Sequence, residues 1–241
     1  MLTSAFAPRW LCAAVFAAVA FAVVTVWVVI AHGPTGLDLA VTATALSIRT
    51  VALTSAATAV TQLGSFPVVV GVAGAAAVTL WLRTERLLLP LTLLITVVET
   101  AAIVFLLKEV VGRDRPPIAD VLGAVSTDGS FPSGHTTNGT VVYVLTTLLL
   151  GMTVCRPWAR RVGLAAAVVV AVAIGLTRIY LGYHWATDVL GGWLLATAIC
   201  SASAFAVCRL GPVGDQEHQL DRHSRSGPTA TDELPARVQR V

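Results

Sequence analysis

The chain has 241 residues, of which 56% are hydrophobic and 12% are charged, and its formal net charge at pH 7 is +3. Its mean hydropathy of +0.81 lies far above that of soluble globular domains, so the composition predicts an integral membrane protein. The basic residues occur in short clusters and form no continuous stripe, which argues against a nucleic-acid partner. The four cysteines lack the close spacing of a zinc site or a redox motif, and we interpret them as small apolar residues.

Six largely uncharged apolar segments are candidates to cross the hydrocarbon core of a bilayer as helices, which takes about 20 residues. In chain order they occupy approximately residues 10–31, 65–82, 87–107, 136–155, 162–177 and 189–208. This pattern predicts an all-α, polytopic membrane fold with six transmembrane helices. The first segment is longer than the apolar region of a signal peptide, so we interpret it as a retained anchor and not as a cleaved leader.

Residues 37–64, between the first two predicted spans, carry threonine and serine at three- and four-residue steps. This is the period of a helix with one polar stripe, and such a helix would lie flat on the membrane surface. Because residues 50–82 contain no charge, a seventh buried segment is the alternative. An odd number of spans would place the two chain termini on opposite sides of the membrane.

The positive-inside rule, applied to the short loops, orients the six predicted spans with both termini in the cytoplasm. The arginines that then fall on the cytoplasmic side are Arg9, Arg83, Arg86, Arg156, Arg160, Arg161 and Arg209. The cations left outside, which need a different explanation, are Arg49, Lys108, Arg113, Arg115 and Arg178. We therefore expect a multi-pass protein of the plasma membrane with a polar site on its extracytoplasmic side.

Residues 209–241 differ from the rest of the chain, because they are rich in Gly, Pro, Ser and residues of both charges and lack hydrophobic periodicity. We expect them to form a disordered cytoplasmic tail. A regulatory or partner-binding tail is the alternative. Residues 1–208 are expected to form a single membrane domain, with the chemically informative motifs within residues 87–208.

Three polar clusters lie at the outer ends of the predicted spans, in residues 108–117, 131–135 and 178–188. In the first cluster, six residues separate Lys108 from Arg115, and two prolines follow the arginine. The planar donor fork of arginine and the compact charge of lysine both suit phosphate oxygens, so the pair predicts an anion clamp. Basic side chains that reach from a helix end to the membrane interface are the alternative interpretation.

The second cluster, Phe131-Pro132-Ser133-Gly134-His135, places a turn directly before an apolar helix. Backbone N–H groups at a helix start and a serine hydroxyl can bind an anion, and glycine lets the backbone approach it closely. Because imidazole titrates near neutral pH, His135 is a candidate general acid for a leaving oxygen. A purely structural histidine at the helix start is the alternative.

The third cluster places His184 and Asp188 four residues apart, on one face if the segment is helical. A hydrogen bond from one ring nitrogen to the carboxylate would fix the tautomer and leave the other nitrogen free as a nucleophile. Arg178 adds a third cation. An aspartate at the edge of a membrane span is costly unless it is paired, so Asp188 is predicted to be functional.

The three clusters together resemble the signatures of the type 2 phosphatidic acid phosphatase (PAP2) superfamily, in the same order and with the same internal spacing. The residues that carry the resemblance are Lys108 through Arg115-Pro116, then Pro132-Ser133-Gly134-His135, then Arg178 through His184 to Asp188. The resemblance covers approximately residues 87–208, and the first two predicted spans carry no motif. One departure is Thr177, where the family pattern usually has serine before the arginine, although threonine keeps the hydroxyl.

The resemblance implies a role for each signature residue. Those that would bind the phosphoryl oxygens are Lys108, Arg115, Ser133, Gly134 and Arg178. His184 would attack phosphorus while Asp188 orients it. His135 would protonate the departing oxygen and then activate the water that hydrolyses the phosphohistidine. No metal or other cofactor is required, because three cations and oriented N–H groups stabilise the charge of the transferring phosphoryl group.

The implied function is hydrolysis of a lipid phosphate or diphosphate, with prenyl diphosphates, phosphatidic acid and phosphatidylglycerol phosphate as candidate substrates. The sequence does not select one of them, and it does not indicate an oligomeric state. A non-catalytic membrane protein that binds or transports lipid phosphates is one alternative, but a binding site needs no oriented nucleophile such as His184 with Asp188. A vanadate-type haloperoxidase is a second alternative, against which six spans and a short loop argue.

Overall fold

The computed structural model describes the backbone of residues 6–225 and the side chains of residues 6–210. The long helices are α1 (Ala7–Ala31), α4 (Phe66–Thr84), α5 (Leu88–Val111), α6 (Gly134–Gly151), α7 (Pro157–Tyr180) and α8 (Ala186–Arg225). The shorter elements are α2 (Gly36–Ser47), α3 (Val51–Thr61) and the 3-10 helices η2 (Gln62–Gly64) and η3 (Ile118–Asp120). No strand occurs within these described residues, so the predicted all-α class is confirmed.

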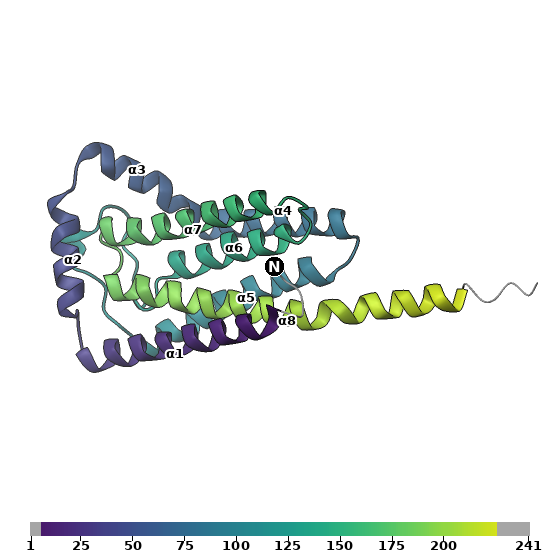
Figure 1. The fold of residues 1–241 in the computed structure, drawn as a ribbon. Coiled ribbons are helices and arrows are strands. Elements are labelled where there is room, and N and C mark those ends of the chain that lie inside the picture. The colour runs from purple at the N-terminus through teal and green to yellow at the C-terminus, as the bar shows by residue number, and fades with distance from the viewer. Residues whose placement is uncertain (1–5, 226–241) are drawn as a thin grey trace, which may run out of the picture.

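The long helices lie side by side, and α2 crosses one end of the bundle that they form (Figure 1). Among the described residues, five helical segments have the length and apolar composition of a membrane span, and they are α1, α4, α5, α7 and residues 186–210 of α8. Each coincides with one of the predicted spans. The chain is therefore a multi-pass membrane protein.

The helix predicted as the fourth span, α6, is 18 residues long but is less apolar than a membrane span normally is. Its first turns carry polar residues, and Thr136, Thr137 and Thr140 among them are buried. The helix lies at the centre of the bundle, in contact with α4, α5, α7 and α8. Because protein and not lipid surrounds it, α6 does not need a fully apolar surface.

The core of the bundle is built from residues of α1, α4, α5, α6 and α8. Leu80, Leu93, Leu145 and Leu149 are completely buried there, and small residues such as Ala196 let neighbouring helices approach closely. The first helix packs along α8. The first predicted span, which carries no motif, is thereby packed against the helix that carries Asp188.

Residues 37–64, for which the sequence left a surface helix or a seventh span open, form α2, α3 and η2. The helices α2 and α3 have 12 and 11 residues, so neither is long enough to cross a bilayer. Arg49, in the turn between them, donates hydrogen bonds of 2.8 Å to the carbonyl oxygen of Tyr180 and of 2.7 Å to that of Asp120. This turn is therefore attached to the end of α7 and to η3.

Two glycines shape the connections at the end of the bundle where α2 lies. Gly112 has a φ of +56° and ends α5, with its N–H bonded to the carbonyl oxygen of Lys108 at 3.0 Å. Gly182 follows α7 with a φ of +79°, and a β-carbon on it would lie 2.2 Å from the carbonyl oxygen of Asp120. Only glycine permits this close approach between the α7–α8 loop and η3.

The last helix is longer than the sequence predicts. Helix α8 continues to Arg225, past the bundle (Figure 1), so residues 209–225 are helical although the whole of 209–241 is expected to be disordered. Residues 226–241 of the expected tail lie outside the described residues.

Candidate active site

The three polar clusters of the sequence meet at the end of the bundle that α2 crosses. Helices α5 and α7 end there, and α6 and α8 begin there, so the topology brings together segments that are far apart in the chain (Figure 1). The loop of residues 112–133 joins α5 to α6, and residues 181–185 join α7 to α8. All eight predicted site residues lie in these two loops or in the helix ends beside them.

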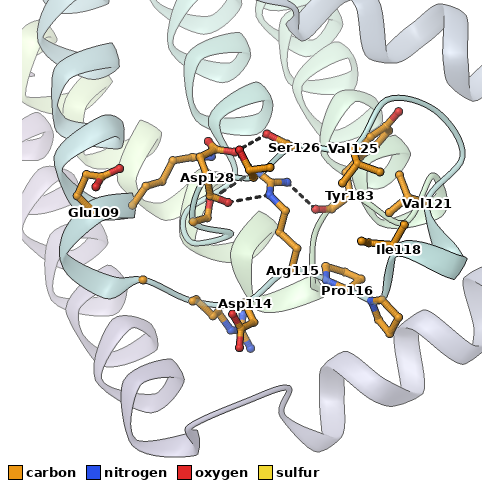
Figure 2. Close-up of a pocket in the computed structure, with 16 residues that line it drawn as sticks. Glu109, Asp114, Arg115, Pro116, Ile118, Val121, Val125, Ser126, Asp128 and Tyr183 are labelled. Atoms are coloured by element: carbon orange, nitrogen blue, oxygen red, sulfur yellow. Dashed lines mark hydrogen bonds and ion pairs between the residues drawn. The ribbon is translucent and has the colours of Figure 1, made fainter.

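A cavity of about 700 Å³ opens at this end of the bundle, and Lys108, Arg115 and Tyr183 are among the residues that line it. Figure 2 shows Arg115 reaching from the 112–133 loop toward Asp128. Arg115 Nη2 lies 2.7 Å from Asp128 Oδ1, and Lys108 Nζ pairs with the other oxygen of the same carboxylate. In this structure, the two cations for which the sequence predicts an anion clamp both contact a carboxylate of the protein itself.

Asp128 is held as a carboxylate by its neighbours, although its side chain is 44% exposed. Partial burial acts to raise the pKa of Asp128. Hydrogen bonds from Lys108 and Ser126, together with the charges of Lys108 and Arg115, outweigh that effect and hold this pKa well below its usual range. The aspartate therefore stays ionised across the physiological pH range.

Arg178 supplies the third cation from the last turn of α7. Its guanidinium carbon lies 3.9 Å from the centre of the Tyr183 ring, and its Nη1 donates a 3.1 Å hydrogen bond to Thr61 on α3. Among the described residues, its buried Nε has no hydrogen-bond partner. A buried guanidinium with an unused donor, within electrostatic reach of Arg115, is suited to an anionic ligand.

The start of α6 provides backbone N–H groups beside the cations. A β-carbon placed on Gly134 would lie 4.0 Å from Cε of Lys108, so the helix backbone passes next to the lysine side chain. Ser133 precedes the helix, and its N–H donates to the carbonyl oxygen of Asp188 at 3.1 Å. His135 lies in the first turn, within electrostatic reach of Lys108 and of both other cations.

His184 lies between Asp188 and Arg115 and is only 2% exposed. Its Nδ1 is 3.4 Å from Oδ2 of Asp188, and its Nε2 is 3.4 Å from Nη1 of Arg115. Burial lowers the pKa of His184 to about 4, although the hydrogen bond to Asp188 and its charge act in the opposite direction. The ring is therefore neutral at pH 7, with one nitrogen on the carboxylate and the other toward the cations.

The profile of the PAP2 superfamily matches residues 88–208, just over half of the 241 residues. The chain belongs to the PAP2 superfamily. The matched segment begins with α5 and contains every residue of the three clusters. The predicted resemblance is thereby confirmed.

Individual relatives of this PAP2 protein match shorter segments. Phosphatidylglycerophosphatase B of Bacillus subtilis is 40% identical over 90 residues, which are 37% of this chain and 43% of that protein. A putative undecaprenyl-diphosphatase of Escherichia coli is 31% identical over 129 residues, 52% of this chain and 61% of that protein. An undecaprenyl-diphosphatase of Sulfolobus acidocaldarius is 34% identical over 97 residues, 39% and 41% of the two chains. The chain thus spans about half the length of these relatives.

The fold also resembles a solved structure. The crystal structure of a transmembrane PAP2 type phosphatidylglycerolphosphate phosphatase from Bacillus subtilis superimposes with a TM-score of 0.74 at 24% sequence identity. The match covers 82% of this chain and 97% of that chain. Two PAP2 proteins therefore share the helix arrangement well beyond the matched motifs, including parts of the first half of the chain.

Several polar residues that sequence analysis did not assign to the site also lie in it. Asp128 pairs with the clamp cations, and Ser130 donates a hydrogen bond to Asp188. Arg113 contacts Asp188 and is buried with Asp38 from α2. Arg113 carried a signal in the sequence as one of the unexplained outer cations. For Asp38 the sequence contains only a local signal, the spacing Thr35-x-x-Asp38 that is typical of a helix capping box.

Proposed function

We propose that this PAP2 protein hydrolyses a lipid phosphate or diphosphate through a phosphohistidine intermediate. The observation that carries the proposal is the orientation of His184, with Nδ1 toward Asp188 and Nε2 toward Arg115. A carboxylate at Nδ1 keeps the ring proton there and leaves the Nε2 lone pair free to attack phosphorus. A site that only binds phosphate would gain nothing from this orientation.

In the proposed complex, the phosphoryl group takes the place of the Asp128 carboxylate between Lys108 and Arg115. Arg178, the Ser133 hydroxyl and the N–H of Gly134 complete its contacts. Cations and a helix N-terminus in a partly water-excluded site stabilise the charge that develops on the phosphoryl oxygens.

The reaction proceeds in two steps. Nε2 of His184 forms a bond to phosphorus as the bond from phosphorus to the leaving oxygen breaks, and His135 gives that oxygen its proton. Water then attacks the phosphohistidine and passes a proton to His135, the P–N bond breaks, and inorganic phosphate leaves. Asp188 stabilises the positive charge of the phosphorylated ring in both steps.

The position of the site supports both a substrate class and an orientation in the membrane. In this proposal α6 also crosses the bilayer, which gives six spans, with the site on the extracytoplasmic side and both termini in the cytoplasm. A site at the end of the bundle meets a phosphate head group at the membrane surface while the apolar tail stays in lipid. The names of the relatives, one phosphatidylglycerophosphatase and two undecaprenyl-diphosphatases, support this substrate class.

The test is phosphate release by the detergent-purified protein from undecaprenyl diphosphate, phosphatidic acid, phosphatidylglycerol phosphate and a soluble sugar phosphate. Wild type should release phosphate from at least one lipid, and His184→Ala should release none, because the nucleophile is missing. The lipid hydrolysed with the highest kcat/KM names the substrate. Activity should persist in EDTA, because the chain's own cations carry the phosphoryl charge.

The matched control is His32→Ala, because His32 is an exposed histidine that follows α1. This variant should retain wild-type activity. Phosphate binding without release by folded wild-type protein would contradict the proposal and favour a lipid-phosphate binding protein. Loss of activity in EDTA would contradict the metal-independent mechanism alone.

A further inference from the structure

A buried chain of charges continues from Asp188 through Arg113, which also lines the cavity, to Asp38 on α2. Arg113 Nη1 is 2.5 Å from Oδ1 of Asp188, and Arg113 Nη2 is 2.7 Å from Oδ2 of Asp38. Both carboxylates are 0% exposed and Arg113 is 8% exposed. Three charged side chains from α2, the 112–133 loop and α8 therefore form one network inside the protein.

Asp38 is fixed in this network from several directions. Its Oδ2 accepts hydrogen bonds of 2.9 Å from both the N–H and the hydroxyl of Thr35. Its Oδ1 accepts 2.9 Å hydrogen bonds from the N–H and the hydroxyl of Thr187, which is the residue before Asp188. The start of α2 is thereby tied to the first turn of α8, which carries the partner of His184.

The charges of the network suggest why it contains two carboxylates and not one. An arginine paired with Asp188 alone would neutralise the carboxylate that faces His184, since the two charges lie within hydrogen-bonding distance. Asp38 pairs with the other end of the guanidinium. Asp38, Arg113 and Asp188 together carry a net charge of about −1, counted with ordinary ionisation states at neutral pH.

We propose that Asp38 and Arg113 are positioning residues for the nucleophile. Arg113 fixes the Asp188 carboxylate, and Asp38 offsets the positive charge of Arg113, so that Asp188 still presents a net negative charge to His184. This inference rests on the proposed function. The phosphorylated ring of His184 carries a positive charge, which the nearby Arg115 and Arg178 oppose and Asp188 stabilises. Asp38 keeps that stabilisation from being cancelled, and it does so from a helix outside the signature motifs.

The charged and titratable groups around His184 define the expected effect on pH dependence. They are Asp188 on α8, Arg178 on α7, Arg115 in the loop after α5, and His135 on α6. Removal of the Asp38 charge makes this environment more positive, which favours the neutral ring. Removal of the Arg113 charge makes it more negative, which favours the protonated ring. The two substitutions should therefore move the titration of His184 in opposite directions.

The test measures kcat, KM and the pH profile of kcat/KM for Asp38→Asn, Arg113→Gln and the double variant. Asp38→Asn should lower kcat by about 10- to 100-fold, the range found for outer partners that orient a reactive histidine. KM should change by less than about threefold, because the effect lies in the transition state. The acid limb of kcat/KM should move to lower pH in Asp38→Asn and to higher pH in Arg113→Gln, by about one unit each.

The double variant distinguishes charge balance from simple packing. With both charges removed, the charge facing His184 returns to about −1, so kcat should recover relative to Asp38→Asn, and the acid limb should return toward the wild-type pH. Additive losses with an unmoved acid limb would overturn the inference and leave the network a purely structural one. If Asp38→Asn cannot be purified in a folded form, the test rests on the acid limb of kcat/KM in the other two variants. That limb should move to higher pH in Arg113→Gln and return toward the wild-type pH in the double variant.

The control is Glu85→Gln, because Glu85 is an exposed carboxylate after α4 and is not among the residues that line the cavity. This variant should retain wild-type activity, and the acid limb of its kcat/KM profile should stay at the wild-type pH. A wild-type protein that releases phosphate from none of the lipids would refute the proposed function itself. If the wild type is active but the acid limb of kcat/KM stays at the wild-type pH in both Asp38→Asn and Arg113→Gln, the inference is refuted and the proposed function stays intact.

Discussion

The nucleophilic role proposed for His184 needs one protonation state, and the burial of the ring favours that state. Only the neutral ring has a lone pair on Nε2, and burial lowers the pKa of this residue to about 4. Because that value lies below the ordinary imidazole pKa of about 6.5, the nucleophile is available over a wider acidic range than an exposed histidine would be. Arg115, Arg178, His135 and Asp188 surround it, and of these only Asp188 is an anion.

The pH profile of kcat/KM should therefore be flat on its acid side down to about pH 5 and fall near pH 4, as His184 gains a proton. Steady-state assays on one monophosphate and one diphosphate lipid measure this limb. The limb should be the same for both substrates, because kcat/KM reports ionisation of the free enzyme, whereas substrate ionisation would shift it between them. A limb near pH 6.5 for both lipids would show that burial does not depress the titration of His184.

Asp128 occupies the position between Lys108 and Arg115 that the proposal gives to the substrate phosphate. The substrate must therefore replace charge-assisted hydrogen bonds that already exist. Asp128→Asn removes the competing charge, so KM for the preferred lipid and the inhibition constant of inorganic phosphate should both fall by about 3- to 10-fold, an effect of about 1 kcal/mol for a partly exposed ion pair. Assays of KM and of phosphate inhibition test both effects.

The matched variant for this prediction is Glu109→Gln, in which an exposed carboxylate one residue after Lys108 loses its charge. It should leave both constants within about twofold of wild type, because surface charges contribute little. If Asp128→Asn instead raises KM, the aspartate supports the two cations and does not compete with the substrate for them.

The loops between helices position these residues, and at Gly182 the α7–α8 loop closely approaches η3. Gly182→Ala combines a φ of +79° with a β-carbon 2.2 Å from Asp120 O, so the two segments would have to separate. We expect a loss of at least about 2 kcal/mol of stability and a strong loss of activity, because His184 lies in the displaced loop. Thermal unfolding in detergent and phosphate release measure the two effects.

Gly112→Ala is a suitable comparison, because Gly112 also has positive φ but a β-carbon there would meet open space. It should cost about 1 kcal/mol, from backbone strain alone. Equal destabilisation by the two alanines would show that the contact with η3 does not constrain the site.

The long helices were largely predictable because their apolar runs are continuous. The segment predicted at 65–82 became α4 (Phe66–Thr84), and the one predicted at 87–107 became α5 (Leu88–Val111). The span predicted at 162–177 was too short, since α7 (Pro157–Tyr180) includes arginines at both ends that interrupt the uncharged run. Charged residues at span ends mark the edge of the membrane and not the end of the helix.

The signature residues were predictable because each motif is local, and helix ends on one side of a bundle must meet. The contacts that support them were not predictable. Arg113 and Asp38 are 75 residues apart in the chain, and Lys108 and Asp128 are 20 apart, with no motif that links either pair. Such pairs are defined by the three-dimensional path of the loops, which hydrophobic periodicity does not describe.

The whole molecule has two distinct ends. Helix α2 and the candidate site lie at one of them, whereas the start of α1 and the extension of α8 lie toward the other (Figure 1). The predicted cytoplasmic arginines 83, 86, 156, 160 and 161 lie in the α4–α5 and α6–α7 connections or in the helix turns beside them, and these connections are at the end opposite the site (Figure 1). Under the positive-inside rule, this distribution of arginines favours the proposed orientation, with the site outside and the termini inside.

The orientation can be tested with cysteines at the two ends and a membrane-impermeant maleimide. Native Cys155 is exposed in the α6–α7 connection, and Ser126 lies in the 112–133 loop beside the cavity. Because Cys12 is also exposed, both proteins carry Cys12→Ser. In intact cells, Ser126→Cys should be labelled in a Cys155→Ser background, whereas native Cys155 should react only after the membrane is permeabilised. The buried Cys200 and Cys208 should stay unlabelled in both samples. Labelling of Cys155 but not of residue 126 in intact cells would place the site in the cytoplasm, where it would act on lipid phosphates of the inner leaflet.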